Sequence, residues 1–167
     1  KYIWSAMANI TNPDMVQQIH REYIDAGADY ITTNTFRTTP RAYEKIGVKG
    51  RGSEDSVHNA RVSLNKAIDL AKEAAGSSVK IIGSIAPLED CYVPEYFPGK
   101  NVAIAEYFQL GKWLIESGID ILLLETMNSI IETETCLTAL ENLGSPIWVS
   151  FVLKDEYHLL SGDSLSD

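Results

Sequence analysis

Polar side chains follow two apolar segments of this chain that are built alike. Residues 26–36 read Ala-Gly-Ala-Asp-Tyr-Ile-Thr-Thr-Asn-Thr-Phe, and residues 117–127 read Ser-Gly-Ile-Asp-Ile-Leu-Leu-Leu-Glu-Thr-Met. Each has a glycine suited to a left-handed helix cap and then an apolar run typical of a buried parallel strand. Because parallel α/β folds keep their chemistry at the carboxyl ends of strands, the polar residues there are the first candidates for a site. They are Thr32, Thr33, Asn34, Thr35, Glu125, Thr126 and Asn128.

Glu125 is the strongest candidate among them for a functional residue. A carboxylate directly after Ile-Leu-Leu-Leu is costly to desolvate unless it meets a cation or several hydrogen-bond donors. It suits the binding of a substrate ammonium group or general base catalysis. The structural alternative is an ion pair with a lysine or arginine of the next strand. The threonines and Asn34 can hold a substrate carboxylate or carbonyl, although threonine is also an ordinary strand residue.

No histidine-based metal site and no serine nucleophile is indicated. Ser84 and Ser150 have no histidine in sequence reach and lie in no GxSxG elbow. His58 and His158 form neither an HxxxH nor an HExxH pattern.

The two cysteines show no metal-ligand spacing. Cys136 shares the apolar face of its helix and is expected in the core. Cys91 lies in a long Pro- and Tyr-rich loop, residues 87–99, where it can approach a site. Trp4 and Ser5 precede the first expected helix, and a tryptophan there can wall a pocket or simply pack in the core.

Several charged or polar side chains are expected to face solvent. His20 lies beside Arg21 and Glu22, which favours the surface. The acidic residues Glu132, Glu134 and Glu141 are interpreted as a solvated helix face.

Helices and strands are expected to alternate along the chain. Helices are predicted over residues 13–27, from Ser53 or Glu54 to Ala75, and over 131–143. A further helix contains Ile104 to Ile115 and ends at Gly118. The strands are predicted over residues 28–33, 80–85, 119–124 and 147–153. This order predicts right-handed βαβ units and a parallel sheet.

A barrel is favoured over an open sheet. The Gly-x-Asp-strand pattern recurs after about ninety residues, which suits the quasi-symmetry of a (β/α)8 barrel. No strand leads into a GxGxxG or GxxxxGK[ST] loop, so a nucleotide-binding fold lacks its usual signature. Because a barrel needs roughly 250 residues, we expect the chain to supply about half of one, roughly strands two to five.

Composition excludes several classes of partner. The 167 residues carry a formal charge of −9 and 45% hydrophobic residues, as in one acidic globular domain. No basic stripe is available to neutralise phosphates, so nucleic acid and anionic membranes are not expected as partners. No apolar run approaches a membrane span, and no signal-peptide pattern is seen. With only two cysteines, a reduced cytoplasmic setting is expected.

Seven short motifs together resemble the homocysteine S-methyltransferase family. They are Trp4-Ser5-Ala6, the helix start Asn12-Pro13, Ala26-Gly27-Ala28-Asp29, Thr33-Asn34-Thr35-Phe36 with Thr39-Pro40, Gly83-Ser84-Ile85-Ala86-Pro87, Leu124-Glu125-Thr126 and Leu165-Ser166-Asp167. The resemblance implies a (β/α)8 barrel that moves a methyl group onto the thiol of homocysteine or selenocysteine. For homocysteine the product is methionine. Family members use S-methylmethionine, S-adenosylmethionine, betaine or methylcobalamin as donor, and a zinc ion activates the thiol.

The resemblance also assigns roles to residues of this chain. It implies that Glu125 meets the ammonium group of the substrate, that Thr33 and Asn34 contact the substrate from a strand end, and that Trp4 and Ser5 line the pocket. It implies no catalytic residue and no metal ligand among these 167 residues. The family's first strand with its Asp-Gly-Gly motif, and its three zinc cysteines, are expected outside residues 1–167, in a longer protein.

Two other functions remain open at this stage. A half-barrel without zinc ligands can be a non-catalytic assembly or binding module, because its sheet edges are free to pair. A different barrel enzyme, an aldolase or isomerase with Glu125 as base, would be supported by a strand-end lysine, and none is seen. The loop around Cys91, Leu88-Glu89-Asp90-Cys91-Tyr92, differs from the Tyr-Gly-rich version in S-methylmethionine-using members, so the resemblance does not fix the donor. It also leaves open the acceptor preference and the oligomeric state.

Overall fold

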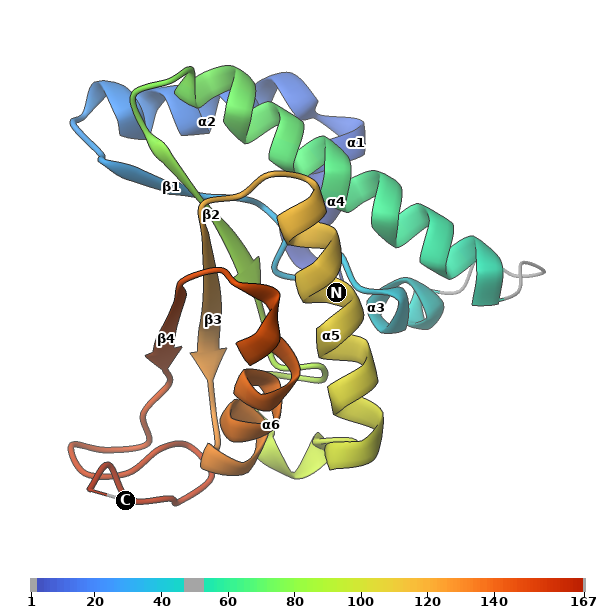
Figure 1. Ribbon diagram of the computed structural model, residues 1–167, viewed down its shortest axis with the longest axis vertical. Helices are drawn as coiled ribbons and strands as arrows, with labels where there is room; N and C mark the ends of the chain where they lie inside the picture. The colour runs from blue at the N-terminus through green and yellow to red at the C-terminus, as the bar shows by residue number, and fades with distance from the viewer. Residues whose placement is uncertain (1–2, 47–52, 167) are drawn as a thin grey trace.

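The computed structural model describes residues 3–46 and 53–166, in which helices and parallel strands alternate (Figure 1). The α-helices are α1 (Ala8–Thr11), α2 (Pro13–Asp25), α3 (Pro40–Lys45), α4 (Ser53–Ala75), α5 (Lys100–Glu116) and α6 (Ile130–Leu140). The strands are β1 (Tyr30–Thr32), β2 (Lys80–Ile85), β3 (Ile121–Met127) and β4 (Ile147–Phe151). Short 3-10 helices cover Trp4–Met7 (η1), Pro94–Tyr96 (η2) and Glu141–Leu143 (η3).

The strands form one parallel sheet in the order β1-β2-β3-β4. Each strand therefore pairs with its neighbour in sequence. A doubly wound sheet reverses its strand order at a switch point, whereas a barrel adds each strand on the same side. Figure 1 shows α4, α5 and α6 on one side of the sheet. The predicted alternation and parallel sheet are confirmed, and the order is that of consecutive barrel strands.

The main core lies between the sheet and helices α4, α5 and α6. Its fully buried members include Leu64, Ile68, Tyr107, Leu114, Leu122, Leu124, Cys136 and Leu140. Gly111 lets α5 approach α6 closely, because a Cβ there would lie 2.2 Å from the Leu140 Cδ2 atom. The expectation that Cys136 belongs to the core is confirmed.

Two short helical segments that precede α4 were not predicted from the sequence. Residues 4–11 form η1 and α1, which place Trp4 and Ser5. The other is α3, whose start carries a recognisable signal. The Thr39 side chain accepts a hydrogen bond from the Ala42 backbone N–H at 3.2 Å, and Pro40 occupies the first helical position.

Within the described residues, no helix is both long enough and apolar enough to cross a membrane.

Candidate functional site

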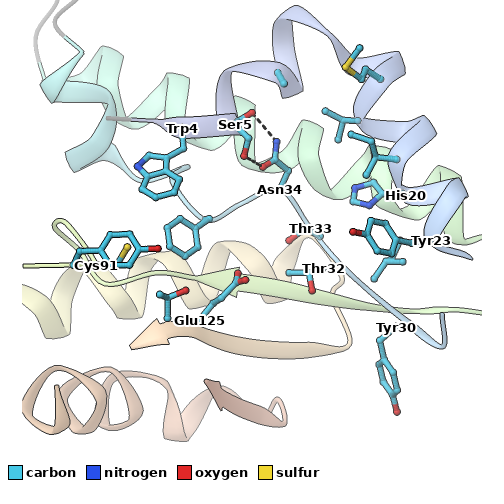
Figure 2. A pocket seen from close by; sticks show the side chains of 18 residues that line it. Trp4, Ser5, His20, Tyr23, Tyr30, Thr32, Thr33, Asn34, Cys91 and Glu125 are labelled. Atoms are coloured by element: carbon cyan, nitrogen blue, oxygen red, sulfur yellow. Dashed lines mark hydrogen bonds between the residues drawn. The ribbon is translucent and has the colours of Figure 1, made fainter. Parts of the chain in front are cut away.

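A cavity of about 720 Å³ lies at the carboxyl ends of β1 and β3. Figure 2 shows Trp4, Ser5 and Asn34 on one side of it, Glu125 on the other, and Cys91 at one end. The lining residues are Trp4, Ser5, Ala8, Met15, Val16, Ile19, His20, Tyr23, Tyr30, Ile31, Thr32, Thr33, Asn34, Phe36, Cys91, Tyr92, Glu125 and Thr126. All five residues predicted to bind substrate line this cavity, although they come from three distant parts of the sequence. Their roles toward a substrate stay predictions.

The Asn34 amide group joins the end of β1 to the turn that carries Trp4. Its Oδ1 atom accepts a hydrogen bond from Ser5 Oγ at 2.6 Å, and its Nδ2 donates to the Ser5 carbonyl at 2.9 Å. Nδ2 also donates to Asn9 Oδ1 at 2.8 Å. Asn9 is fully buried and donates in turn to the Asn34 carbonyl. Asn34 and Ser5 therefore shape one wall of the cavity by bonding to each other.

The threonine hydroxyls after β1 bind the neighbouring strand. Thr33 and Thr35 are buried, and their hydroxyl oxygens lie 2.8 Å apart. The single Thr33 hydroxyl proton can be donated to Thr35 Oγ1 or to the Ile82 carbonyl, 3.1 Å away, and Thr35 donates to the Ser84 carbonyl at 2.9 Å. The Ser84 backbone N–H donates back to Thr35 Oγ1 at 3.1 Å. This network fixes the ends of β1 and β2 and leaves little hydrogen-bonding capacity at Thr35 for a ligand.

Glu125 is half-buried and keeps most of its hydrogen-bonding capacity. Its Oε2 atom accepts a hydrogen bond from Ser84 Oγ at 2.5 Å. None of the salt bridges formed within residues 3–46 and 53–166 involves Glu125, so the ion pair considered from the sequence is not formed there. A carboxylate with one neutral donor can bind a cationic ligand at its remaining lone pairs.

Backbone strain is concentrated at the same cavity. Trp4 and Thr126 are the two non-glycine residues with positive φ among the described residues, at 44° and 61°, and both line the cavity. For a β-branched residue such as Thr126 this conformation is unfavourable. It coincides with an irregularity in the pairing of β3 and β4, and the Ser150 hydroxyl accepts the Thr126 N–H at 3.1 Å. Strain of this kind clusters at functional sites, which supports this strand end as one.

The far end of the cavity is mostly apolar and includes His20, which the sequence placed on the surface. That prediction was wrong: His20 is only 7% exposed. It lies one helical turn after buried Val16, on the face of α2 that turns inward, so the charged neighbours in sequence were misleading. Burial lowers the pKa of His20, which favours the neutral imidazole. Its Nε2 atom has no hydrogen-bond partner among the described residues.

The apolar lining from α2 was also missed, although the sequence carries a signal for it. Met15, Ile19 and Tyr23 recur at every fourth position, so they form a stripe along the helix. All three are exposed and line the cavity, and Figure 2 shows Tyr23 next to His20.

Glu132 was interpreted as part of a solvated helix face, and this was wrong. It is 2% exposed, whereas Glu134 and Glu141 are exposed as expected. Glu132 lies one turn before Cys136, on the face of α6 that enters the core. Its Oε1 atom accepts hydrogen bonds from Tyr107 Oη at 2.6 Å and from the Leu88 N–H at 2.9 Å. Burial raises the pKa of Glu132, while these two hydrogen bonds oppose that rise.

Cys91 and Asn128 meet beside the cavity. Cys91 is buried and lines the cavity, as the sequence allowed, and burial raises the pKa of its thiol. Asn128 is buried and does not line the cavity; its Nδ2 atom donates to the Cys91 carbonyl at 3.1 Å. Across the described part of the chain, no group of three or more His, Cys, Asp or Glu side chains could hold a metal ion.

The arrangement suits a small cationic ligand with an apolar stem. The Trp4 and Phe36 rings, whose centroids lie 5.8 Å apart, share this cavity with the Glu125 carboxylate. Aromatic faces attract cations, and their burial of apolar atoms excludes water from a charge pair. The amino group of an amino acid has the required charge and size.

The model of one protein family matches the whole chain, residues 1–167: homocysteine S-methyltransferase. The chain belongs to this family. The family resemblance inferred from the sequence motifs is thereby confirmed.

Individual relatives support the same family at moderate identity. Homocysteine S-methyltransferase 2 of Zea mays is 26% identical over 98% of this chain and 53% of its own length. Homocysteine S-methyltransferase of Escherichia coli is 27% identical over 99% of this chain and 56% of its own length. Betaine-homocysteine S-methyltransferase of Drosophila melanogaster is 29% identical over 99% and 55%. The chain thus spans about half the length of the curated relatives it matches.

A solved structure of the family confirms the fold class. The metallated form of the homocysteine methyltransferase MmuM from Escherichia coli superposes with a TM-score of 0.82 at 25% identity, over 99% of this chain and 60% of that protein. The chain is therefore part of a (β/α)8 barrel, as the sequence predicted.

Proposed function

We propose that the complete protein containing this chain transfers a methyl group from a sulfonium donor, S-methylmethionine or S-adenosylmethionine, to the thiol of homocysteine, giving methionine. Membership of the homocysteine S-methyltransferase family supports the reaction class. The observation that carries the assignment to this cavity is the Glu125 carboxylate, which lines it at a strand end and forms no salt bridge with another described residue.

In this proposal Glu125 binds the ammonium group of homocysteine. A carboxylate and an ammonium that are both partly desolvated attract each other more strongly than they do in water. Ser84 orients the carboxylate through its 2.5 Å hydrogen bond, and Ser84 is itself fixed by Thr35. Trp4 and Phe36 cover the apolar part of the substrate, while Asn34 and Ser5 hold Trp4 in place.

In this proposal, zinc is bound by parts of the complete protein outside this chain. The family resemblance implies a zinc ion that activates the thiol, and one MmuM structure is described as metallated. The residues present here do not fit such a site, since no cluster of three potential ligands occurs in the described ranges. We therefore assign no zinc ligand among the described residues, and the proposed contribution of this chain is to bind and orient the amino-acid end of the substrate.

Methyl transfer by the complete gene product tests the proposal. Purified protein is incubated with homocysteine and, in separate reactions, S-methylmethionine, S-adenosylmethionine or betaine, and methionine is quantified. We expect methionine from a sulfonium donor. Glu125→Gln should lower kcat/KM at least ~30-fold, because a charge-assisted hydrogen bond contributes about 2 kcal/mol or more. Glu134→Gln, which removes an exposed acid of α6, should leave it unchanged.

Two results would contradict this proposal. Folded wild-type protein that gives no methionine with any of these donors would refute the reaction. Equal activity of Glu125→Gln and Glu134→Gln would refute the role of Glu125.

A non-catalytic assembly or binding module is the second candidate. It is favoured by the large apolar side chains of the outer strand β4, since Trp148, Val149 and Phe151 are all exposed. Sedimentation of the 167-residue chain would show concentration-dependent association if this surface pairs. A chain that stays monomeric at every concentration would contradict this candidate.

A further inference from the structure

The loop that follows β2 is held by buried hydrogen bonds from three separate elements. Arg37, after β1, donates from Nη1 to the Pro87 carbonyl at 2.9 Å. Glu132, on α6, accepts the Leu88 N–H at 2.9 Å. Asn128, after β3, donates to the Cys91 carbonyl at 3.1 Å. Each of these side chains is buried. Residues 87–91 are therefore fixed from the loop after β1, from the end of β3 and from α6.

Glu132 is the only one of the three that accepts a hydrogen bond from this loop. Its carboxylate lies in the core, and a second donor, Tyr107 Oη, lies 2.6 Å from the same Oε1 atom. Tyr107 is itself fully buried on α5. A buried backbone N–H is costly to leave unpaired, so this acceptor helps to fix Leu88, together with Arg37 at Pro87 and the salt bridges of Arg41 and Lys45 to Glu89.

The position of Leu88 bears on the cavity through the residues that follow it. Cys91 and Tyr92 line the cavity with Trp4 and Glu125, and Figure 2 shows Cys91 at its end. Glu132 does not line the cavity. Glu132 therefore makes no direct contact with a ligand in the cavity, and the loop links it to the wall formed by Cys91 and Tyr92.

We propose that Glu132 is a positioning residue for the substrate pocket: with Tyr107, it fixes the Leu88 N–H and so places the wall formed by Cys91 and Tyr92. The consequence for substrate binding depends on the proposed methyl transfer, whereas the consequence for the loop does not. A loosened wall weakens substrate binding without changing any group that contacts Glu125.

The test compares Glu132→Ala with Glu132→Gln in the complete gene product. Glutamine keeps an oxygen that can accept the Leu88 N–H, whereas alanine keeps none. Amide hydrogen exchange is followed in the peptide covering residues 86–92, and alkylation of Cys91 by iodoacetamide is followed by peptide mass. Cys136, fully buried in the core, serves as the internal standard for global opening.

We expect loop exchange and Cys91 alkylation to rise at least ~10-fold in Glu132→Ala, and less than ~3-fold in Glu132→Gln, because alanine leaves the buried Leu88 N–H without an acceptor and glutamine does not. The Cys136 rate should change less than the Cys91 rate in both variants. Tyr107→Phe provides a milder variant if Glu132→Ala does not fold, since it removes the second donor and leaves the Leu88 bond. It should raise the Cys91 rate by a smaller factor than the loss of the acceptor.

Steady-state kinetics distinguish a displaced pocket wall from a general loss of folded protein. A smaller folded fraction lowers apparent kcat and leaves KM unchanged, whereas a displaced wall raises KM. We expect KM for a substrate to rise in Glu132→Ala and to recover in Glu132→Gln.

The inference is overturned if loop exchange and Cys91 alkylation stay at wild-type rates in Glu132→Ala, or in Tyr107→Phe where the alanine variant does not fold. It is also overturned if the loop loosens while KM stays constant. If wild-type protein transfers no methyl group, the proposed function fails, and exchange and alkylation still decide whether Glu132 holds the loop.

Discussion

Glu125 and Glu132 belong to the same β3–α6 unit and have opposite surroundings. Glu125 follows the strand's apolar run, is half-buried, and accepts one hydrogen bond, from Ser84. Glu132 lies on the first turn of α6, is buried, and accepts hydrogen bonds from Tyr107 and Leu88. Glu132 is thus occupied by the protein's own donors, whereas Glu125 still offers lone pairs to the cavity. A carboxylate that contributes to folding and one available for a ligand are distinguished here by their partners and not by sequence position.

The largest expected effect on stability is that of Glu132→Ala. It leaves two buried donors, Tyr107 Oη and the Leu88 N–H, without an acceptor, so the free energy of unfolding should fall by about 3 kcal/mol. Glu125→Ala should lower it by less, about 1 kcal/mol, because it leaves only one buried donor, Ser84 Oγ, without its acceptor. Urea unfolding followed by tryptophan fluorescence measures both. A larger loss in Glu125→Ala than in Glu132→Ala would reverse the comparison.

Asn34→Ala extends the comparison to a residue that lines the cavity but is bonded to the protein. Asn34 lines the cavity but bonds to Ser5 and Asn9, so its loss should lower the free energy of unfolding by about 2 kcal/mol. The same urea titration measures the change. Asn12→Ala is a suitable control, since Asn12 is exposed and its side chain makes no capping hydrogen bond to α2. An Asn34→Ala protein as stable as this control would mean that the Ser5–Asn34 contact adds nothing to folding.

Predictions from the sequence were correct where a short run of residues marks the element by itself. The strand over residues 80–85 and the polar residues that end β1 and β3 were found because glycines and apolar runs mark them. Helix α3 was missed although Thr39-Pro40 is a recognisable helix start. Its short length gives no apolar periodicity to detect.

The surroundings of His20 and Glu132 could not be predicted in the same way. His20 is followed by Arg21, and Glu132 has Glu134 two positions on, yet both lie one turn from a buried residue, so the helical periodicity was ambiguous. The groups that make burial of Glu132 tolerable, Tyr107 and Leu88, belong to distant segments. Only the tertiary structure brings these donors to the carboxylate.

Thr126→Gly tests whether the strain beside Glu125 is stored in the fold. Glycine adopts φ near 61° without a Cβ penalty, so the free energy of unfolding should rise by about 0.5–1 kcal/mol. Thr126→Ala keeps a Cβ and should gain less. Thermal unfolding of the two variants measures the difference. Equal melting temperatures would show that the Thr126 backbone is not strained.

The smallest expected effect is a pH dependence carried by Glu132. Its pKa is raised in the folded state above the ordinary 4.5, so its contribution to stability is fully present below about pH 4.5 and is lost as pH rises through the folded-state pKa. Glu132→Gln cannot ionise, so its stability relative to wild type should improve as pH rises over that range. Urea unfolding at a series of pH values measures this. A stability difference that is constant with pH would contradict the raised pKa.

Recognition of the substrate ammonium group is the central role proposed for Glu125. The most direct test measures, by calorimetry, binding of homocysteine and of its analogue lacking the amino group to the wild-type complete protein and to Glu125→Gln. We predict that wild type binds the analogue at least ~30-fold more weakly than homocysteine, while Glu125→Gln distinguishes the two by less than ~3-fold, since the contact contributes about 2 kcal/mol. Loss of the amino group that weakens binding equally in both proteins would contradict the account.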